Sequence, residues 1–242
     1  MLSLEKQNAL REQYQQRRPG WQPATEQYAA LVRKYLPPNG RLLDLGCGRG
    51  GLVEQLEHPL SRMIGLDPDW LSLTEHRLGI PRAVGFSHCL PFAPAVFDVV
   101  FASWLLEHLK RPLDTLAEIH RVLKPGGVFI FITPNGRHPI AWLNRGLGRF
   151  ARLQKQLVQR LYGRATTDTF PTYYRANTIP TLHQLGQKTG LTLIEYYPIP
   201  DPTYLAFTPF LFRLMCYLEE TLPPSMRLHL VGVYQKPPLS PK

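Results

Sequence analysis

Residues 42–50 read Leu-Leu-Asp-Leu-Gly-Cys-Gly-Arg-Gly, and they set the architecture that we expect for the chain. An apolar strand should reach the carboxylate of Asp44 and then enter a glycine-rich loop. Because glycine has no Cβ, such a loop can turn sharply and approach a ligand closely. A second apolar run, residues 63–66, leads into Asp67, 21 residues after Gly46. An acidic residue at about this spacing holds ribose hydroxyls in nucleotide-binding folds, so the sequence predicts a nucleoside-containing cofactor.

The glycines alone do not identify this cofactor. Gly46, Gly48 and Gly51 also fit the G-x-G-x-x-G pattern of dinucleotide-binding proteins. Asp44 separates the two interpretations, because a carboxylate would repel the pyrophosphate of NAD. The same carboxylate would attract S-adenosylmethionine (SAM), which carries an ammonium and a sulfonium. We therefore expect SAM, with NAD as the alternative and a helix-capping role as the structural alternative for Asp44.

Further motifs follow this loop in a fixed order. They are LLDLGCGRG (42–50), IGLDPD (64–69), LPF (90–92), FDVVFASWLLEHL (97–109) and EIHRVLKPGGVFIFITPN (118–135). Their order and spacing resemble the class I SAM-dependent methyltransferases, in particular the methyltransferase type 11 domains found in ubiquinone and menaquinone methyltransferases. The matching region covers about two-fifths of the chain.

This resemblance implies a set of cofactor-binding residues. The methionine end of SAM would lie against Asp44, Gly46 and Gly48, and the ribose hydroxyls would bind Asp67. The Ser103–Trp104 region would lie beside the methionine carboxylate or the methyl group. The complete expected set is Asp44, Gly46, Cys47, Gly48, Asp67, Pro68, Cys89, Leu90 and Ser103.

The chain departs from the family pattern at the adenine end. Many members carry an Asp four residues before the LPF element, where it binds the adenine amino group, but this chain has Phe86 there. The adenine contact is then expected from the backbone near Cys89 and Leu90, or from Ser87 or His88.

The apolar pattern predicts one α/β domain over residues 1–242. We expect a Rossmann-like sheet of seven strands, mostly parallel with an antiparallel last strand, and helical lid insertions. The expected strands are 41–45, 62–66, about 82–86, 97–102, 127–132, 191–197 and 229–235, and the expected helices are 23–35, 51–57, 69–78, 104–109 and 113–123. Residues 1–22 would form an N-terminal flap, 23–135 the cofactor-binding core, and 136–190 and 201–228 lid insertions that shape the acceptor pocket.

Composition narrows the class of protein. Residues 1–10 are too polar for a signal peptide, and the apolar stretch 204–218 is too short to span a bilayer. The three cysteines lack C-x-x-C spacing, and the eight histidines lack metal-ligand spacing. We expect a cytoplasmic protein with reduced thiols and no bound metal.

The net charge of +10 is concentrated in residues 137–164, which hold six arginines, one lysine and no acid. Leucines and a phenylalanine recur there at three- and four-residue steps, which predicts a basic amphipathic helix. It could be a solvated lid face or a peripheral contact with an anionic membrane. Nucleic acid is an unlikely partner, because aromatic residues do not alternate with the charges.

Two residues are the candidates for catalysis. His108, in the Glu107-His108 pair, could accept a proton from the acceptor, and Tyr173 could line the acceptor site. The alternatives are that the pair braces a helix and that residues 168–178 form a helix-entry loop capped by Asn177 or Thr178. We expect methyl transfer to a small molecule, for which the aromatic run 204–217 favours a hydrophobic, lipid- or quinone-like compound. A SAM-binding protein without transferase activity and an NAD oxidoreductase are the alternatives.

Overall fold

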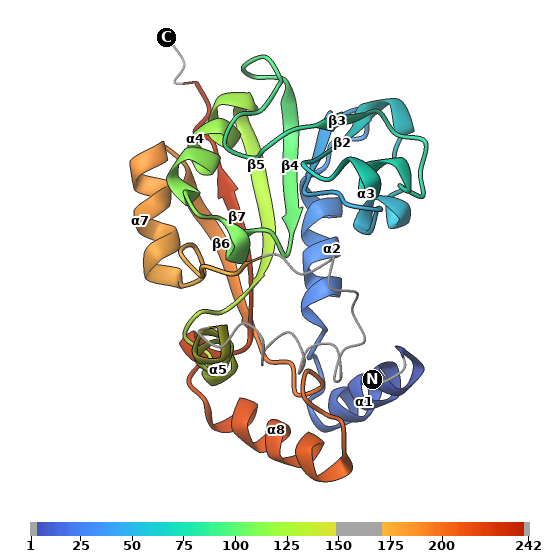
Figure 1. The fold of residues 1–242 in the computed structure, drawn as a ribbon, viewed down its shortest axis with the longest axis vertical. Helices are drawn as coiled ribbons and strands as arrows, with labels where there is room; N and C mark the ends of the chain where they lie inside the picture. Colours follow the sequence, from blue (N-terminus) through green and yellow to red (C-terminus); the bar gives the residue numbers. More distant parts are fainter. Residues whose placement is uncertain (1–3, 149–170, 240–242) are drawn as a thin grey trace.

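The computed structural model describes residues 4–148 and 171–239. Within these ranges seven strands form one sheet in the order β3-β2-β1-β4-β5-β7-β6 (Figure 1). The strands are β1 (Leu42–Leu45), β2 (Met63–Asp67), β3 (Arg82–Val84), β4 (Phe97–Ser103), β5 (Leu123–Pro134), β6 (Thr192–Ile199) and β7 (His229–Gln235). Neighbours among β1 to β5 are parallel, and β7 is antiparallel to both β5 and β6. The predicted fold class is confirmed.

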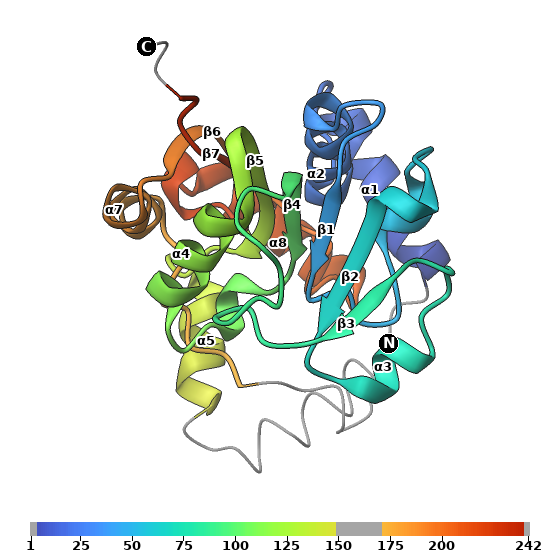
Figure 2. The same cartoon turned by 90° about the horizontal axis from the view of Figure 1, so that it is seen from above.

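Both faces of the sheet are buried, which is why its central strands read as continuous apolar runs. The main helices are α1 (Leu4–Arg17), α2 (Ala24–Tyr35), α3 (Trp70–Thr74), α4 (Pro112–Val122), α5 (Pro139–Gly148), α7 (Ile179–Thr189) and α8 (Pro209–Thr221). Alternate residues such as Leu42 and Leu43 point to opposite faces. One face packs against α2, and the other packs against α4 and α7 (Figure 2).

Several element boundaries differ from prediction. The short 3-10 helices are η1 (Leu52–Gln55), η2 (Leu60–Arg62), η3 (Leu106–His108) and η5 (Pro224–Met226). The helices expected at 51–57 and 104–109 are thus single turns, the first followed closely by Pro59, which disfavours helix in the residue before it. The helix expected at 69–78 ends at Thr74, since the Arg77 N–H is donated to the Arg49 carbonyl.

Strand β5 begins earlier than the expected residue 127. It starts at Leu123, opposite Phe97, and the next paired residues are Val99 and Val128. Three extra residues of β5 therefore bulge out, which accommodates the turn at Gly126.

Helices α1, α5 and α8 lie together beyond the carboxyl ends of the parallel strands (Figure 1). Tyr14 of α1 shares a small core with Phe212 and Cys216 of α8, and Ile140 of α5 packs against Met215 of α8. Of the expected basic helix 137–164, α5 is the described part, and residues 149–164 lie outside the described ranges. The division into flap, core and lids stays a prediction.

Candidate functional site

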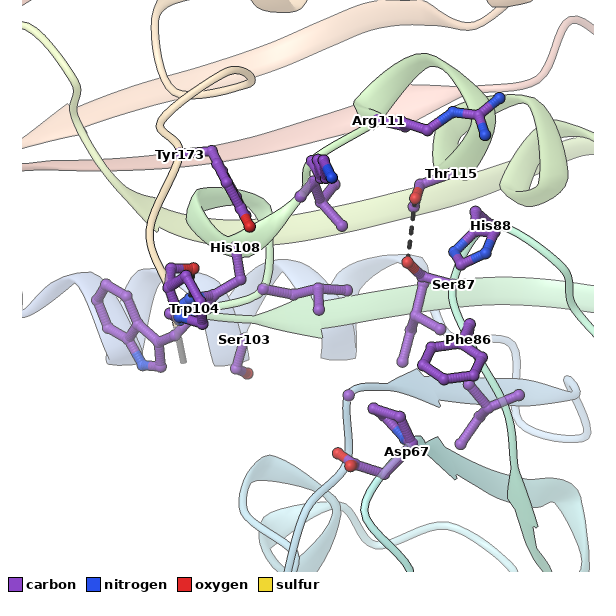
Figure 3. A pocket seen from close by; sticks show the side chains of 18 residues that line it. Asp67, Phe86, Ser87, His88, Ser103, Trp104, His108, Arg111, Thr115 and Tyr173 are labelled. Atoms are coloured by element: carbon purple, nitrogen blue, oxygen red, sulfur yellow. Dashed lines mark hydrogen bonds between the residues drawn. The ribbon is translucent and has the colours of Figure 1, made fainter. Parts of the chain in front are cut away.

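A cavity of about 570 Å³ opens at the carboxyl ends of β1, β2 and β4 (Figure 3). Its surface is mostly apolar, with polar groups on two opposite walls. The residues that line it are Leu45, Gly46, Leu66, Asp67, Pro68, Phe86, Ser87, His88, Ser103, Trp104, Leu105, His108, Leu109, Lys110, Arg111, Thr115, Pro171 and Tyr173. Its volume and lining are typical of a small-molecule site in an open α/β sheet.

The glycine loop orients the carboxylate of Asp67. Gly46 and Gly48 have φ angles of 79° and 48°, which L-residues with a Cβ rarely adopt. In this conformation the Gly48 N–H donates to Oδ2 of Asp67 at 2.9 Å, and the Asp69 N–H donates to Oδ1 at 2.9 Å. Each carboxylate oxygen keeps a further lone pair, so the pre-oriented Asp67 can still accept hydrogen bonds from two hydroxyl groups.

Asp44 lies buried at the end of β1, next to the strand that carries Asp67. Burial, with the nearby charge of Asp67 as a smaller cause, raises the pKa of Asp44 to about 8. A buried carboxylate of this kind is stabilised in its ionised form by a neighbouring cation. Its position does not support the helix-capping alternative, because the next helix, η1, begins after Gly51.

Five of the nine expected cofactor-binding residues are absent from the cavity lining. Asp44 and Gly48 still lie beside Asp67, which does line the cavity, but the other three, Cys47, Leu90 and Cys89, lie elsewhere. The side chain of Cys47 is buried, with its Sγ beside Gly65 of β2. Leu90 is part of the core, and its N–H donates to the Glu118 carboxylate at 2.7 Å. Cys89 is exposed elsewhere, and its N–H donates to the Phe86 carbonyl. The local motif placed these residues near the site in sequence, but their side chains turn away from the cavity.

Pro68, Ser103 and both catalytic candidates do line the cavity. Ser103 Oγ donates to the buried Tyr28 hydroxyl at 3.1 Å, which fixes the Ser103 side chain at the end of β4. The ring of Tyr173 projects into the cavity near Trp104 and His108, facing the wall that carries Asp67 (Figure 3).

The Glu107-His108 pair divides its roles between core and cavity. Glu107 is buried, and burial raises its pKa to about 7. His108 faces the cavity, with its Nδ1 2.9 Å from the carbonyl oxygen of Pro171. Because a carbonyl can only accept, Nδ1 must carry the proton of the neutral ring, and Nε2 is then the basic nitrogen.

A buried network holds Pro171 and Tyr173 against this histidine. The Tyr173 N–H donates to the Glu107 carbonyl at 2.7 Å, and Thr133 Oγ1 donates to the Glu107 carboxylate at 3.0 Å. The Asn177 amide donates to Thr133 Oγ1 at 2.6 Å and thereby ties the end of β5 to this loop. Thr178 caps the N-terminus of α7, which agrees with the alternative that residues 168–178 lead into a helix. Thr133 lies within the motif 118–135 and Asn177 was considered only as a helix cap, so sequence reasoning missed the network that joins them.

Trp104 lines the cavity, as the resemblance implied, whereas Lys110, Arg111 and Thr115 were missed. Trp104 takes a left-handed backbone conformation, with φ 55°, and its ring lies edge-on to His229 at 5.0 Å. Lys110, Arg111 and Thr115 line the cavity from the start of α4 and the turn before it. In the described residues no group of three or more His, Cys, Asp or Glu side chains is arranged to hold a metal ion.

Comparison with known proteins agrees with this geometry. Residues 43–131 match the family model described as a methyltransferase domain. The ubiquinone biosynthesis O-methyltransferase of Bordetella pertussis is 31% identical over 169 residues, which cover 66% of this chain and 67% of that protein. The chain belongs to the class I SAM-dependent methyltransferases. SAM is accordingly its cofactor.

Other relatives are similar over smaller parts. An uncharacterised methyltransferase of Synechocystis is 31% identical over 113 residues, so the chain spans about half (52%) of its length. A solved complex of the Haloferax volcanii Trm112 methyltransferase activator with a methyltransferase contains a chain of the same fold. Its TM-score is 0.62 at 19% identity, with 90% of each chain covered.

The residues present fit SAM. The glycine loop of this methyltransferase lets the backbone approach a ligand, and Asp67 offers acceptors for two ribose hydroxyls. The buried Asp44 matches the positive charge at the methionine end. We propose Asp44, Gly46, Gly48, Asp67, Pro68 and Ser103 as the cofactor-binding set.

Proposed function

We propose that this protein transfers the methyl group of SAM to a hydroxyl group of an apolar small molecule. The observation that carries this proposal is the pairing of opposite walls in one cavity: Asp67 on one side, His108 and Tyr173 on the other (Figure 3). The printed name of the Bordetella relative, a ubiquinone biosynthesis O-methyltransferase, supports an oxygen acceptor on a hydrophobic molecule.

His108 and Tyr173 would act on the acceptor. When bound, SAM supplies an electrophilic methyl group on its sulfonium. A hydroxyl attacks such a centre well only as it loses its proton, so a base within hydrogen-bond reach accelerates transfer. The Pro171 carbonyl holds the His108 ring with Nε2 as its basic atom, and Nε2 would take this proton. Tyr173 and Trp104 would hold an apolar acceptor in line, and their aromatic surfaces would exclude water.

Two measurements test the function. Calorimetry should show that the protein binds SAM and does not bind NADH, whereas the reverse would favour the oxidoreductase alternative. Incubation with methyl-labelled SAM and a lipid-plus-small-molecule extract should then place the label on an apolar compound. Mass spectrometry in deuterated solvent should show that this product has one exchangeable hydrogen fewer than its precursor. SAM binding without any labelled product would favour a SAM-binding protein without activity.

We also propose that α8 contacts an anionic membrane, from which such an acceptor could enter. Phe210, four residues before Leu214, and Tyr217, three residues after it, lie on one face of α8 and are 74% and 68% exposed. Trp142 and Leu143 on the neighbouring α5 are exposed too. Residues 201–228 were expected to shape the acceptor pocket, but the aromatics of the run 204–217 do not line the cavity, and Phe212 is buried in a small core. Exposed aromatics on a protein of net charge +10 are typical of contact with anionic lipid.

Vesicle co-sedimentation tests this contact. Wild type should sediment with vesicles containing phosphatidylglycerol and stay in solution with pure phosphatidylcholine. The double variant Phe210→Ser/Tyr217→Ser should lose most of the bound fraction, because two interfacial anchors are removed. The control is Trp70→Ser on α3, which removes an aromatic that is 67% exposed on a different helix and should change nothing. Equal sedimentation of the double variant would rule out α8 as the contact.

In the described residues no helix is long and apolar enough to cross a bilayer.

A further inference from the structure

On the same side of the cavity as Asp67 lies an aromatic side chain that is largely exposed. Phe86 comes two residues after β3, lines the cavity and is 60% exposed. In Figure 3 its ring lies beside Asp67, with the imidazole of His88 next to it. The two ring centres are 5.5 Å apart, at an interplanar angle of 34°. A large apolar ring so exposed inside a cavity offers a flat surface to a ligand.

The backbone holds Phe86 in this position rigidly. The Cys89 N–H closes a tight turn onto the Phe86 carbonyl at 3.0 Å, and the hydroxyls of Ser87 and Thr115 are 3.0 Å apart. At the end of the turn the Leu90 N–H binds Glu118, whose carboxylate is held by Arg121 at 2.7 and 2.8 Å. These contacts fix the turn from which the Phe86 ring extends into the cavity.

The turn that carries Phe86 contributes no carboxylate to this end of the cavity. Among the described residues that line it, Asp67 is the only one with a carboxylate. The N–H groups of Cys89 and Leu90 are donated within the protein. Ser87 and His88 are the polar side chains that line the cavity on the same turn as Phe86, and a hydroxyl or a neutral imidazole can either donate or accept.

We infer that Phe86 binds the purine of the cofactor by stacking and that the site does not distinguish a 6-amino purine from a 6-oxo purine. This rests on the proposed SAM site, with the ribose at Asp67. An aromatic ring stacks on either purine, because every base has a π-face. A carboxylate would accept from a 6-amino group and repel a 6-oxo group, but a side chain that both donates and accepts tolerates either.

The test compares two thionucleosides by calorimetry: S-adenosyl-L-homocysteine and S-inosyl-L-homocysteine, its 6-oxo analogue. Wild type should bind both with dissociation constants within about threefold of each other. Phe86→Ala should weaken both by a similar factor, about 5- to 150-fold for the loss of one stacked ring. Phe86→Tyr keeps the ring and should bind both as wild type does. Phe86→Asp should prefer the adenosyl compound by at least about tenfold, for one added charge-assisted contact.

Each outcome decides a separate point. Wild-type preference for the adenosyl compound by more than about tenfold would overturn the relaxed specificity, and unchanged binding by Phe86→Ala would overturn the stacking. If wild type bound neither compound, the SAM site itself would be wrong and this inference would fail with it. Thermal unfolding of the folded variants separates loss of binding from loss of structure.

Discussion

Asp67→Ala is expected to weaken SAM binding by between about 30-fold and about 1000-fold. The variant loses two charge-assisted hydrogen bonds to the ribose, which are worth about 2–4 kcal/mol after partial replacement by water. It also leaves the N–H groups of Gly48 and Asp69 without their carboxylate acceptor, so the glycine loop should lose its fixed geometry. Calorimetric titration with SAM measures the change.

The neighbouring carboxylate of Asp69 provides the control. Asp69 caps α3 by accepting from the N–H groups of Leu71 and Ser72, and it does not line the cavity. Asp69→Ala should lower stability by about 1 kcal/mol, the usual cost of a lost N-cap, and leave SAM affinity nearly unchanged. An Asp67→Ala protein that binds SAM as wild type does would show that the ribose site is elsewhere.

His108→Asn is expected to lower the rate of methyl transfer by about 10²- to 10⁴-fold, the usual contribution of a general base. The amide nitrogen of Asn can replace Nδ1 as donor to the Pro171 carbonyl, so the loop should keep its place. The variant lacks the basic Nε2, so the hydroxyl of the acceptor would have to lose its proton to water. Single-turnover transfer to the acceptor found in the extract measures this loss.

Two further measurements distinguish a general base from a purely structural role for His108. SAM affinity should be unchanged in His108→Asn, because His108 is on the wall opposite Asp67. The wild-type rate should fall at low pH as the imidazole becomes protonated, and the Asn variant should lack this fall. A variant that keeps the wild-type rate and pH profile would contradict the proposed role and leave His108 as a structural residue.

The sequence alone determined the sheet, and the cofactor-binding residues that it indicated at the ends of β1 and β2 remain a prediction. Continuous apolar runs such as Val128–Ile132 are typical of a strand buried on both faces, and the structure has this run in the buried strand β5. Gly46, Gly48 and Asp67 lie at the ends of adjacent parallel strands, where the local motifs place them. Features fixed within a few residues are visible in a local motif. The direction of individual side chains is not visible in a local motif, and the side chains of Cys47 and Leu90 point into the core.

Only the tertiary structure decided the acceptor side. The tautomer of His108 depends on Pro171, 63 residues away, and the brace between Thr133 and Asn177 spans 44 residues. No local pattern encodes such contacts, because packing of β5, η3 and the loop before α7 brings these segments together. On α8, the aromatic run likewise gave no indication that Phe212 is buried and Phe210 exposed. Which side chains are buried depends on the packing of α1 and α5 against one face of α8, because this packing leaves the other face exposed to solvent.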